Sequence, residues 1–306
     1  MEAEHAPLRS GDIASRVFLE LAAERRRVTS RWRLWILARR LAVRERRPLP
    51  PALYGGRLVQ TLIRRGALTP WASPHLRDVY VVSAPYADLV PLEEEQVLQE
   101  ANPEGYFCFQ TALLHHGISN EFPGNLSMAK VSSHSRPPLG TQEDDWVGLP
   151  RPSPQTPRMI GRTPIVWAPT RSVREVGIAA MPTASGMIWV TDLERTLIDA
   201  IQNPSLCLGI ANVLRAWRIG ARDWNLDRLI AHAEQLEAGP VMRQRVGFLV
   251  EALGGRHPTL DQWRDRRERG GSLKLVAANP YSSSFDPRWN ISINVPQAAL
   301  GELAEE

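Results

Sequence analysis

The segment YGGRLVQTLIRRGAL, residues 54–68, is compatible with one regular structure. Its large apolar residues fall at i, i+1, i+4 and i+5, which places them in a single stripe along an α-helix. These residues are Leu58, Val59, Leu62 and Ile63. Gly66 follows at the position where a helix C-cap belongs. We therefore expect a helix that packs this stripe against a core and exposes its polar side chains.

Two helices and a hairpin flank this segment. DIASRVFLELAAERRR begins with Asp12 as an N-cap and repeats apolar residues at every fourth position. TSRWRLWILARRLAV forms a second helix, which the RRPLPP run ends because proline cannot continue a helix. ALTPWASPHLRDVYVV has the pattern of a strand, a tip and a second strand. This order predicts a winged helix-turn-helix over residues 1–90, whose last helix enters the major groove of DNA.

The positive charge of the sequence is concentrated at its N-terminal end. Residues 1–66 contain 15 Arg and 6 acidic residues, a net charge of +9. Residues 67–306 contain 22 basic and 27 acidic residues, a net charge of −5. A general preference for Arg over Lys does not explain this asymmetry, because it selects the cation and not its position. A local cationic surface is typical of proteins that bind a polyanion.

We therefore predict an interface for double-stranded DNA in the first domain. Arg can bond to O6 and N7 of guanine, and Gln can bond to N6 and N7 of adenine. The residues expected at this interface are Arg31, Arg33, Arg57, Gln60, Thr61, Arg64, Arg65, His75 and Arg77. The alternative is a surface helix whose charges are solvated and bind nothing.

Residues 91–306 are expected to form a second domain of mixed α and β structure, so the predicted fold class is α+β. Within residues 84–100, EEEQVLQE predicts a solvated helix that separates the two domains. Residues 132–162 contain many prolines among Ser, Gly and Asp. This composition predicts a long exposed loop without fixed structure.

Two pairs of residues in the second domain invite a metal or redox interpretation. His115 and His116 end a short helix before a glycine, but adjacent helical residues point in different directions, and we interpret them as structural. Cys108 and Cys207 are too isolated for a disulfide framework or a C-x-x-C site and are expected to be buried apolar residues. We therefore predict no metal site.

The segment IWVTDLERTLIDAI concentrates charges that resemble an active site but that the start of a helix explains. Thr191 opens a T-x-x-E capping box, and Asp192 places negative charge in the first turn. Arg195 and Asp199 have the spacing of an i, i+4 ion pair. Each charge thus has a structural role in this interpretation.

Three segments of the second domain together resemble the AbiEi family of bacterial antitoxins and transcriptional regulators. In that family a winged helix-turn-helix precedes an antitoxin domain with a TD-x-E-R-T-L-x-D helix, an R-x-G-x-L-x-E helix and a terminal RW-x-x-x-x-N strand. The matching residues are Asp192, Glu194, Arg195, Thr196, Leu197, Asp199, Arg245, Gly247, Leu249, Glu251, Arg288, Trp289 and Asn294. RRGAL, residues 64–68, and RDVYVV, residues 77–82, are similar to the recognition helix and the wing of the family.

This resemblance implies a repressor of its own operon that also neutralises a toxin. The first domain would bind repeats in the promoter, and the second would counter an AbiEii-type nucleotidyltransferase toxin encoded beside it. Such systems are of type IV, in which the antitoxin need not form a stable complex with the toxin, and they are associated with phage defence by abortive infection. A regulator of this family without a toxin partner is an alternative.

A nuclease or other nucleic-acid-processing enzyme that docks through the winged domain is the alternative from a different class. GGSLKL, residues 270–275, is similar to the Gly-Ser turn of nucleotidyltransferases, but no D-x-D pair for their metal follows it. A P-loop, a G-x-G-x-x-G after a strand and an H-E-x-x-H are also missing from the sequence. QEDDW, residues 142–146, has clustered carboxylates without the Lys that a nuclease would need. We predict a protein that is not an enzyme and binds no cofactor.

The sequence has no run of about 18 apolar residues, and its N-terminus lacks the apolar segment of a signal peptide. We therefore expect a cytoplasmic protein without a membrane partner.

Overall fold

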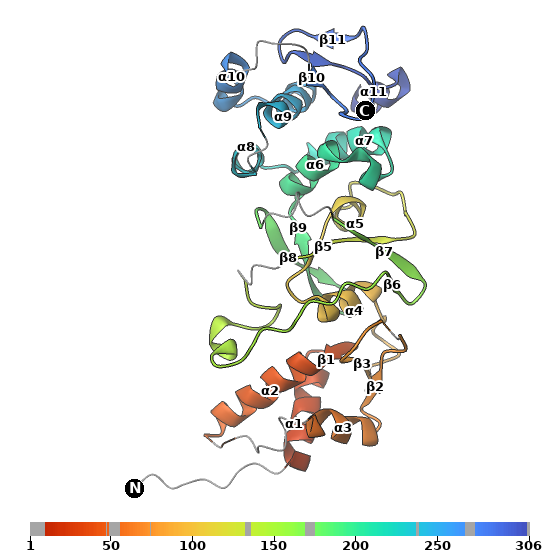
Figure 1. The fold of residues 1–306 in the computed structure, drawn as a ribbon, viewed down its shortest axis with the longest axis vertical. Coiled ribbons are helices and arrows are strands. Elements are labelled where there is room, and N and C mark those ends of the chain that lie inside the picture. The colour runs from red at the N-terminus through yellow and green to blue at the C-terminus, as the bar shows by residue number, and fades with distance from the viewer. Residues whose placement is uncertain are drawn as a thin grey trace. The chain divides into compact units, whose positions relative to one another are not determined.

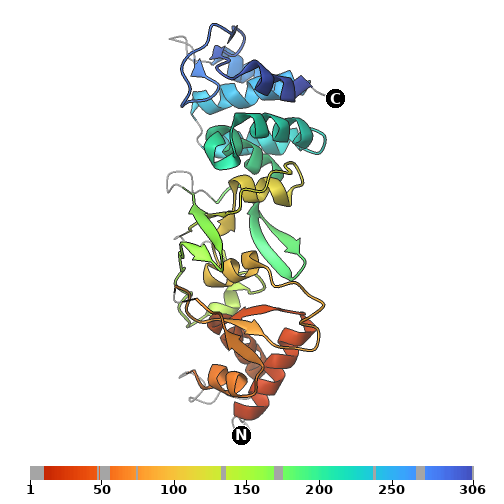
Figure 2. The same ribbon diagram turned by 90° about the vertical axis from the view of Figure 1, so that its right-hand side faces the viewer.

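The computed structural model describes residues 10–46, 48, 56–73, 75–131, 136–168, 175–236, 239–266 and 273–304. Within these residues it contains 11 α-helices and three β-sheets (Figures 1 and 2). The expected α+β class is therefore confirmed. None of the helices in these ranges combines the length and the apolar character needed to cross a membrane.

The first sheet has three antiparallel strands. β1 (Val28–Ser30) and β2 (Leu68–Pro70) lie on either side of β3 (Val79–Val82). The remaining strands are β4 (Tyr106–Phe107), β5 (Leu126–Ala129), β6 (Met159–Ile160), β7 (Thr163–Trp167), β8 (Ile178–Thr183), β9 (Gly186–Thr191), β10 (Leu273–Lys274), β11 (Phe285–Asp286) and β12 (Ile291–Ser292). They form a six-stranded sheet in the order β6-β7-β5-β4-β9-β8 and a small sheet in the order β10-β12-β11.

The chain folds into two compact units that each combine separate stretches of sequence. Unit 1 comprises Met1–Tyr106, Lys130–Ile165 and Ala180–Trp189. Unit 2 comprises Phe107–Ala129, Val166–Ala179 and Val190–Glu306. The boundary predicted after residue 90 lies inside unit 1, and independent folding of residues 1–90 stays a prediction.

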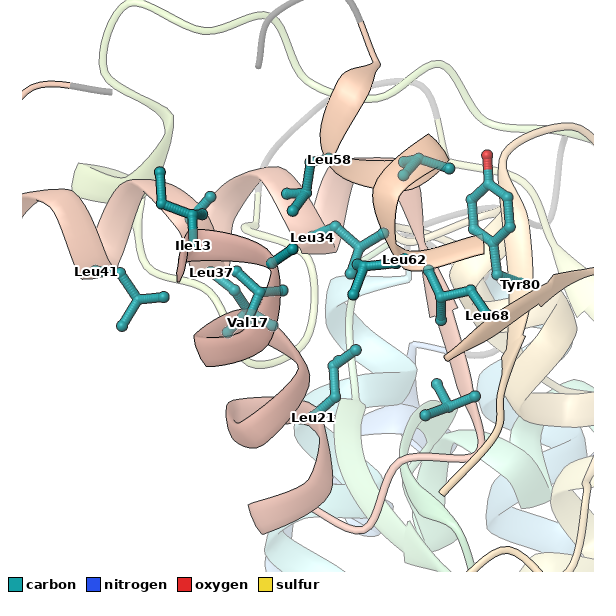
Figure 3. Close-up of a cluster of buried hydrophobic side chains, with 14 residues drawn as sticks. Ile13, Val17, Leu21, Leu34, Leu37, Leu41, Leu58, Leu62, Leu68 and Tyr80 are labelled. Carbon is teal, nitrogen blue, oxygen red and sulfur yellow. The ribbon is translucent and has the colours of Figure 1, made fainter. Parts of the chain in front are cut away.

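The N-terminal part of unit 1 contains α1 (Ser10–Ala23), α2 (Arg31–Arg44) and α3 (Arg57–Arg64). The apolar stripes of these helices meet in one core together with β2 and β3 (Figure 3). Its members include Ile13, Val17, Leu21, Leu34, Leu37, Leu41, Leu58, Leu62, Leu68 and Tyr80. Each fully buried aliphatic side chain contributes about 1.5–3 kcal/mol relative to an exposed one. The stripe expected on residues 54–68 therefore packs as the sequence predicts.

The ends of these helices are partly those that the sequence predicts. Gly66 follows α3 with φ of +70°, the left-handed conformation of a helix C-terminus. α1 begins at Ser10, so Asp12 lies in its first turn and is not the N-cap. Ser30 is the N-cap of α2 and accepts a hydrogen bond from the backbone N–H of Arg33. Ser30 also ends β1, a strand that the sequence analysis did not predict.

α4 (Glu94–Ala101) is buried, which contradicts the prediction of a solvated helix. Its polar side chains are satisfied inside unit 1. The side-chain oxygen of Gln99 accepts a hydrogen bond from the backbone N–H of Trp189 at 2.8 Å, and the side-chain nitrogen of Gln96 donates to Thr183 Oγ1 at 3.1 Å. A helix of polar composition can occupy a core when each polar group finds such a partner.

The proline-rich segment is part of unit 1 and has a defined structure over residues 136–162, so the predicted lack of fixed structure is wrong there. It contains a 3₁₀ helix, Glu143–Trp146, whose Trp146 is buried. Asp145 forms an ion pair with Arg40 of α2 at 2.6 Å. Residues 132–135 lie outside the described part of the chain.

Unit 2 is largely helical. Its helices are α5 (Phe109–His115), α6 (Leu193–Gln202), α7 (Ile210–Gly220), α8 (Leu226–Gln235), α9 (Pro240–Ala252), α10 (Pro258–Asp265) and α11 (Gln297–Ala304). α5 ends before Gly117, as expected. In the C-terminal segment β12 is a strand of two residues, and α11, which was not predicted, follows it and packs against α7.

Candidate nucleic-acid interface

α3 presents a polar face on the surface of unit 1. Arg57, Gln60 and Arg64 are exposed, whereas Leu58 and Leu62 are buried. Residues three and four positions apart lie on the same side of a helix, so the three polar side chains form one row. Two guanidinium groups and an amide provide the donors and the acceptor that reach base edges in a major groove.

Two further residues expected on this face already have partners. Thr61 donates its hydroxyl hydrogen to the backbone oxygen of Arg57 at 2.7 Å, which is a helical i to i−4 contact. Arg65 follows the last turn of α3, is exposed, and donates to Ser15 Oγ at 2.8 Å. Thr61 is therefore the less available of the two for a ligand.

The hairpin of β2 and β3 carries His75 and Arg77, and both are exposed. The side-chain amide of Gln155 bonds to both backbone groups of Arg77, at 2.8 Å each. These two hydrogen bonds fix the backbone near the hairpin tip and leave the guanidinium group of Arg77 at the surface. The proline-rich segment thus supports the hairpin.

The two arginines expected on α2 have different environments. Arg31 is exposed and lies 3.8 Å from Asp78. Arg33 is 5% exposed and donates from Nε to Glu100 at 2.6 Å and from Nη1 to the backbone oxygen of Leu139 at 3.0 Å. Burial, together with the charge of Arg26 and against the pull of Glu100, lowers the pKa of Arg33 to about 10. The assignment of Arg33 to the DNA surface is wrong, because its cation is enclosed and paired.

Other arginines of the N-terminal segment also form ion pairs within unit 1. These pairs are Arg16–Glu45, Arg26–Glu24, Arg40–Asp145 and Arg44–Glu20. The acidic partners in the first, second and fourth of these pairs are already counted in the net charge of +9 over residues 1–66. Asp145, which pairs with Arg40, and Glu100, which pairs with Arg33, lie beyond residue 66 and neutralise part of that charge, so +9 overstates the charge available to a ligand. The exposed cations of α3 and the hairpin remain as the candidate interface.

The acidic start of α6 is structural, but its cap differs from the predicted one. Thr191 is the last residue of β9, and Asp192 is the N-cap, accepting from the backbone N–H of Arg195 at 2.8 Å. The other carboxylate oxygen of Asp192 lies 2.8 Å from His232 Nε2. Burial opposes ionisation of Asp192, but the bonds from His232 and from the backbone of Arg195 outweigh it and lower the pKa of Asp192.

The ion pair expected between Arg195 and Asp199 is present, and it is buried. Arg195 Nε donates to Asp199 Oδ1 at 2.8 Å, and Arg195 Nη1 donates to the backbone oxygen of Val176 at 3.0 Å. Burial raises the pKa of Asp199 to about 6 even though Arg195 stabilises the carboxylate. Thr196 bonds to Thr191. The Thr191–Thr196 bond joins the end of β9 to α6, and the bond from Arg195 to Val176 joins α6 to the segment before β8.

Residues of the R-x-G-x-L-x-E motif of α9 contact the side chain of Trp289. The indole Nε1 donates to Glu251 at 2.8 Å, and Glu251 also pairs with Arg264 at 2.7 Å. A Cβ atom added at Gly247 would lie 2.1 Å from the Trp289 ring, so only glycine leaves room for the indole. Arg245 Nε donates to the backbone oxygen of Lys274 at 2.9 Å. This motif therefore ties α9 to the C-terminal segment.

Asn294 organises the backbone around β10. Its side chain accepts from the backbone N–H of Val276 and donates to the backbone oxygens of Val276, Asn279 and Pro280. The residue is 6% exposed. The motif residues of α6, α9 and the C-terminal segment thus form structural contacts inside unit 2 and leave no cluster of free catalytic groups among those contacts.

The histidines and cysteines set aside from the sequence have ordinary environments. His116 Nε2 lies 2.7 Å from the backbone oxygen of Thr191. Cys108 and Cys207 are buried, and burial raises the pKa of both thiols. No cluster of three or more potential metal ligands occurs in the residues that the structure describes.

The structure also shows partners that the sequence does not indicate. Glu100 and Asp145 bind arginines of α2, and Gln155 binds the hairpin, although they are separated from these partners by 67 to 105 residues along the chain. A local sequence pattern carries no signal for pairs of this kind.

Comparisons with known proteins give little further guidance. No known protein family matches this chain, and no curated protein matches it. The crystal structure of the RV2827C protein from Mycobacterium tuberculosis is similar to this chain, with 17% sequence identity, coverage of 99% of this chain and 98% of that chain, and a TM-score of 0.47. This degree of similarity supports no functional conclusion.

Proposed function

We propose that this protein is a transcriptional regulator that binds double-stranded promoter DNA through α3 and the β2–β3 hairpin. The element order α1-β1-α2-α3-β2-β3 is the order of a winged helix-turn-helix, in which the last helix enters the major groove. The observation that carries the proposal is the row of Arg57, Gln60 and Arg64 on the exposed side of α3. Such a regulator acts in the cytoplasm, without cofactor, metal or catalysis.

In this proposal α3 reads base edges and the hairpin contacts the backbone of the duplex. Arg57 and Arg64 bond to guanine or phosphate, and Gln60 bonds to adenine. Arg77 at the hairpin reaches phosphate oxygens, which fix the orientation of the protein but carry no sequence information.

We further propose that the protein is an AbiEi-type antitoxin and represses its own operon. The support is the resemblance of α6, α9 and the RW-x-x-x-x-N segment to that family. Because the motif side chains contact one another inside unit 2, they maintain the shape of the unit, and neutralisation of the nucleotidyltransferase toxin depends on its outer surface.

The first test is fluorescence anisotropy of the full chain on its own upstream promoter and on a scrambled duplex, across a salt series. We expect the promoter to stay bound at salt concentrations that release the scrambled duplex. Release of both duplexes at the same salt concentration would refute the proposal of a sequence-specific regulator. Cleavage of either duplex that stops when magnesium is chelated would establish a nuclease instead.

Variants of α3 locate the interface. Arg57→Ala and Arg64→Ala should each weaken promoter binding by about 1–3 kcal/mol if the residue reads a base, or reduce the salt slope by about 0.9 if it contacts one phosphate. Arg44→Ala is the control for net charge, because Arg44 is an exposed residue of α2 and its substitution removes the same single positive charge. Equal effects of all three substitutions would show that only net charge matters.

A growth assay separates toxin neutralisation from repression of the promoter. Expression of the neighbouring nucleotidyltransferase gene should arrest growth, and the full chain should restore it. The Arg57→Ala/Arg64→Ala double variant should still restore growth but no longer repress a reporter under the promoter. Failure of the unaltered chain to restore growth would leave a regulator without a toxin partner.

A further inference from the structure

Unit 1 contains a pocket of about 620 Å³ next to α3. Its walls come from the start of α2, the start of α3, the connection between β2 and β3, the end of α4 and residues 146–155. Pockets that hold small molecules typically measure about 300–1,000 Å³ and combine apolar walls with a few polar groups. The size of this pocket therefore suits a small organic ligand.

The walls of the pocket are rich in flat apolar groups. Trp32, Trp35 and Trp146 line it, and the ring centroids of Trp32 and Trp146 are 6.0 Å apart with planes tilted by 42°. Leu58 and Leu149 add aliphatic surface. Indole faces favour planar aromatic groups, which stack against them or meet them edge to face.

The charged side chains that line the pocket leave a net positive charge. Arg31 and Arg77 are exposed on its lining, and Asp78, 3.8 Å from Arg31, offsets one of the two cations. Glu100 also lines the pocket, but its carboxylate accepts from Arg33 at 2.6 Å and from Ser30 Oγ at 2.6 Å, so its charge is compensated. One uncompensated cation at an apolar pocket matches a ligand with one negative charge.

We propose that this pocket binds a planar aromatic monoanion, with its ring system among the tryptophans and its carboxylate at Arg31 and Arg77. The carboxylate would occupy Arg77, one of the cations that contact DNA in the proposed function. Occupancy therefore weakens DNA binding, a consequence that rests on the proposed function, whereas the binding of the ligand itself does not.

Isothermal titration calorimetry of the full chain with 2-naphthoate tests the site, and the neutral 2-naphthamide serves as the matched probe. We expect 2-naphthoate to bind with a stoichiometry of one and about tenfold more tightly than the amide, because charge-assisted hydrogen bonds contribute about 1.5–3 kcal/mol. Arg77→Gln should remove this preference. Equal affinity for the two probes, or no heat of binding at millimolar 2-naphthoate, would overturn the proposal.

A steric variant identifies the pocket. Ser153 is exposed and lines the pocket, so Ser153→Phe fills it without altering the core. Ser83→Phe is the control, because Ser83 is also exposed in unit 1 but lies outside the lining. Ser153→Phe should abolish 2-naphthoate binding and Ser83→Phe should not; binding that survives Ser153→Phe refutes this location.

Promoter binding in the presence of 2-naphthoate tests the effect of the ligand on DNA binding separately from ligand binding itself. Saturating 2-naphthoate should lower the affinity for the promoter severalfold in the unaltered chain and leave it unchanged in Ser153→Phe. If the chain binds no promoter at all, the proposed function fails, and the calorimetry still decides the ligand site. If 2-naphthoate binds but promoter affinity stays the same, the site stands and its effect on DNA binding is refuted.

Discussion

The substitution Gly247→Ala tests the contact between α9 and Trp289 directly. The added Cβ atom would lie 2.1 Å from one atom of the indole ring and 2.4 and 2.6 Å from two others, so the ring must move. Trp289 is 1% exposed, its Nε1 donates to Glu251 at 2.8 Å, and its backbone oxygen accepts from Gln244 at 2.6 Å. The ring therefore cannot move without breaking the bond to Glu251.

The expected loss of stability follows from three contributions. Overpacking a core costs about 1–3 kcal/mol. Loss of a hydrogen bond to a charged group costs about 1.5–3 kcal/mol. The higher helix propensity of alanine offsets roughly 1 kcal/mol of this total. We expect Gly247→Ala to lower the free energy of unfolding by about 2–5 kcal/mol.

Urea denaturation of the full chain, followed by far-UV circular dichroism, measures this loss. Gly301→Ala in α11 is the control, because nothing lies within 4 Å of its added Cβ atom, and its stability should equal or slightly exceed that of the unaltered chain. Adding Trp289→Leu to Gly247→Ala should cost less than the sum of the single substitutions. Additive losses, or a Gly247→Ala variant as stable as Gly301→Ala, would refute the assigned contact.

Three further substitutions test buried contacts by the same denaturation assay. Arg33→Ala should cost about 3–5 kcal/mol, because it leaves the buried carboxylate of Glu100 without its closest cation; a loss below 1 kcal/mol would contradict the burial of this pair. Asn294→Ala should cost at least about 2 kcal/mol, because four backbone groups lose their side-chain partner; a neutral effect would show that water replaces the amide. The lowered pKa of Asp192 contributes stability that is present above its unfolded value of about 3.9 and is lost as pH falls through its lower folded value. Asp192→Asn should therefore destabilise the chain near pH 6 and differ less from it near pH 3, and a difference independent of pH would refute the role of its charge.

The elements that could be predicted from the sequence are those defined by short-range periodicity. The stripe of Leu58, Val59 and Leu62 needs only a repeat of 3.6 residues and a core to pack against, so α3 follows from its own sequence. Asn225 caps α8, and Pro240 begins α9, and both effects act within one turn of the helix.

The elements that could not be predicted depend on partners far along the chain. α4 has the composition of a solvated helix, and only the distant groups that bond to Gln96 and Gln99 permit its burial. The proline-rich segment has the composition of an exposed loop, but Trp146 packs against Trp32 with ring centroids 6.0 Å apart. Composition describes what a segment prefers in isolation, and these contacts override that preference.

The same limit applies to the candidate interface. The Arg excess indicates which part of the chain could meet a polyanion, but it does not distinguish Arg33, enclosed with Glu100, from Arg57, exposed on α3. In unit 1 arginine holds α2 and the proline-rich segment together where it is buried, and offers a cation to a ligand where it is exposed. Substitution of either residue by alanine removes one positive charge. The two results must nevertheless differ in kind, because Arg33→Ala removes a buried partner and lowers stability, whereas Arg57→Ala lowers promoter affinity and leaves the unfolding curve in place.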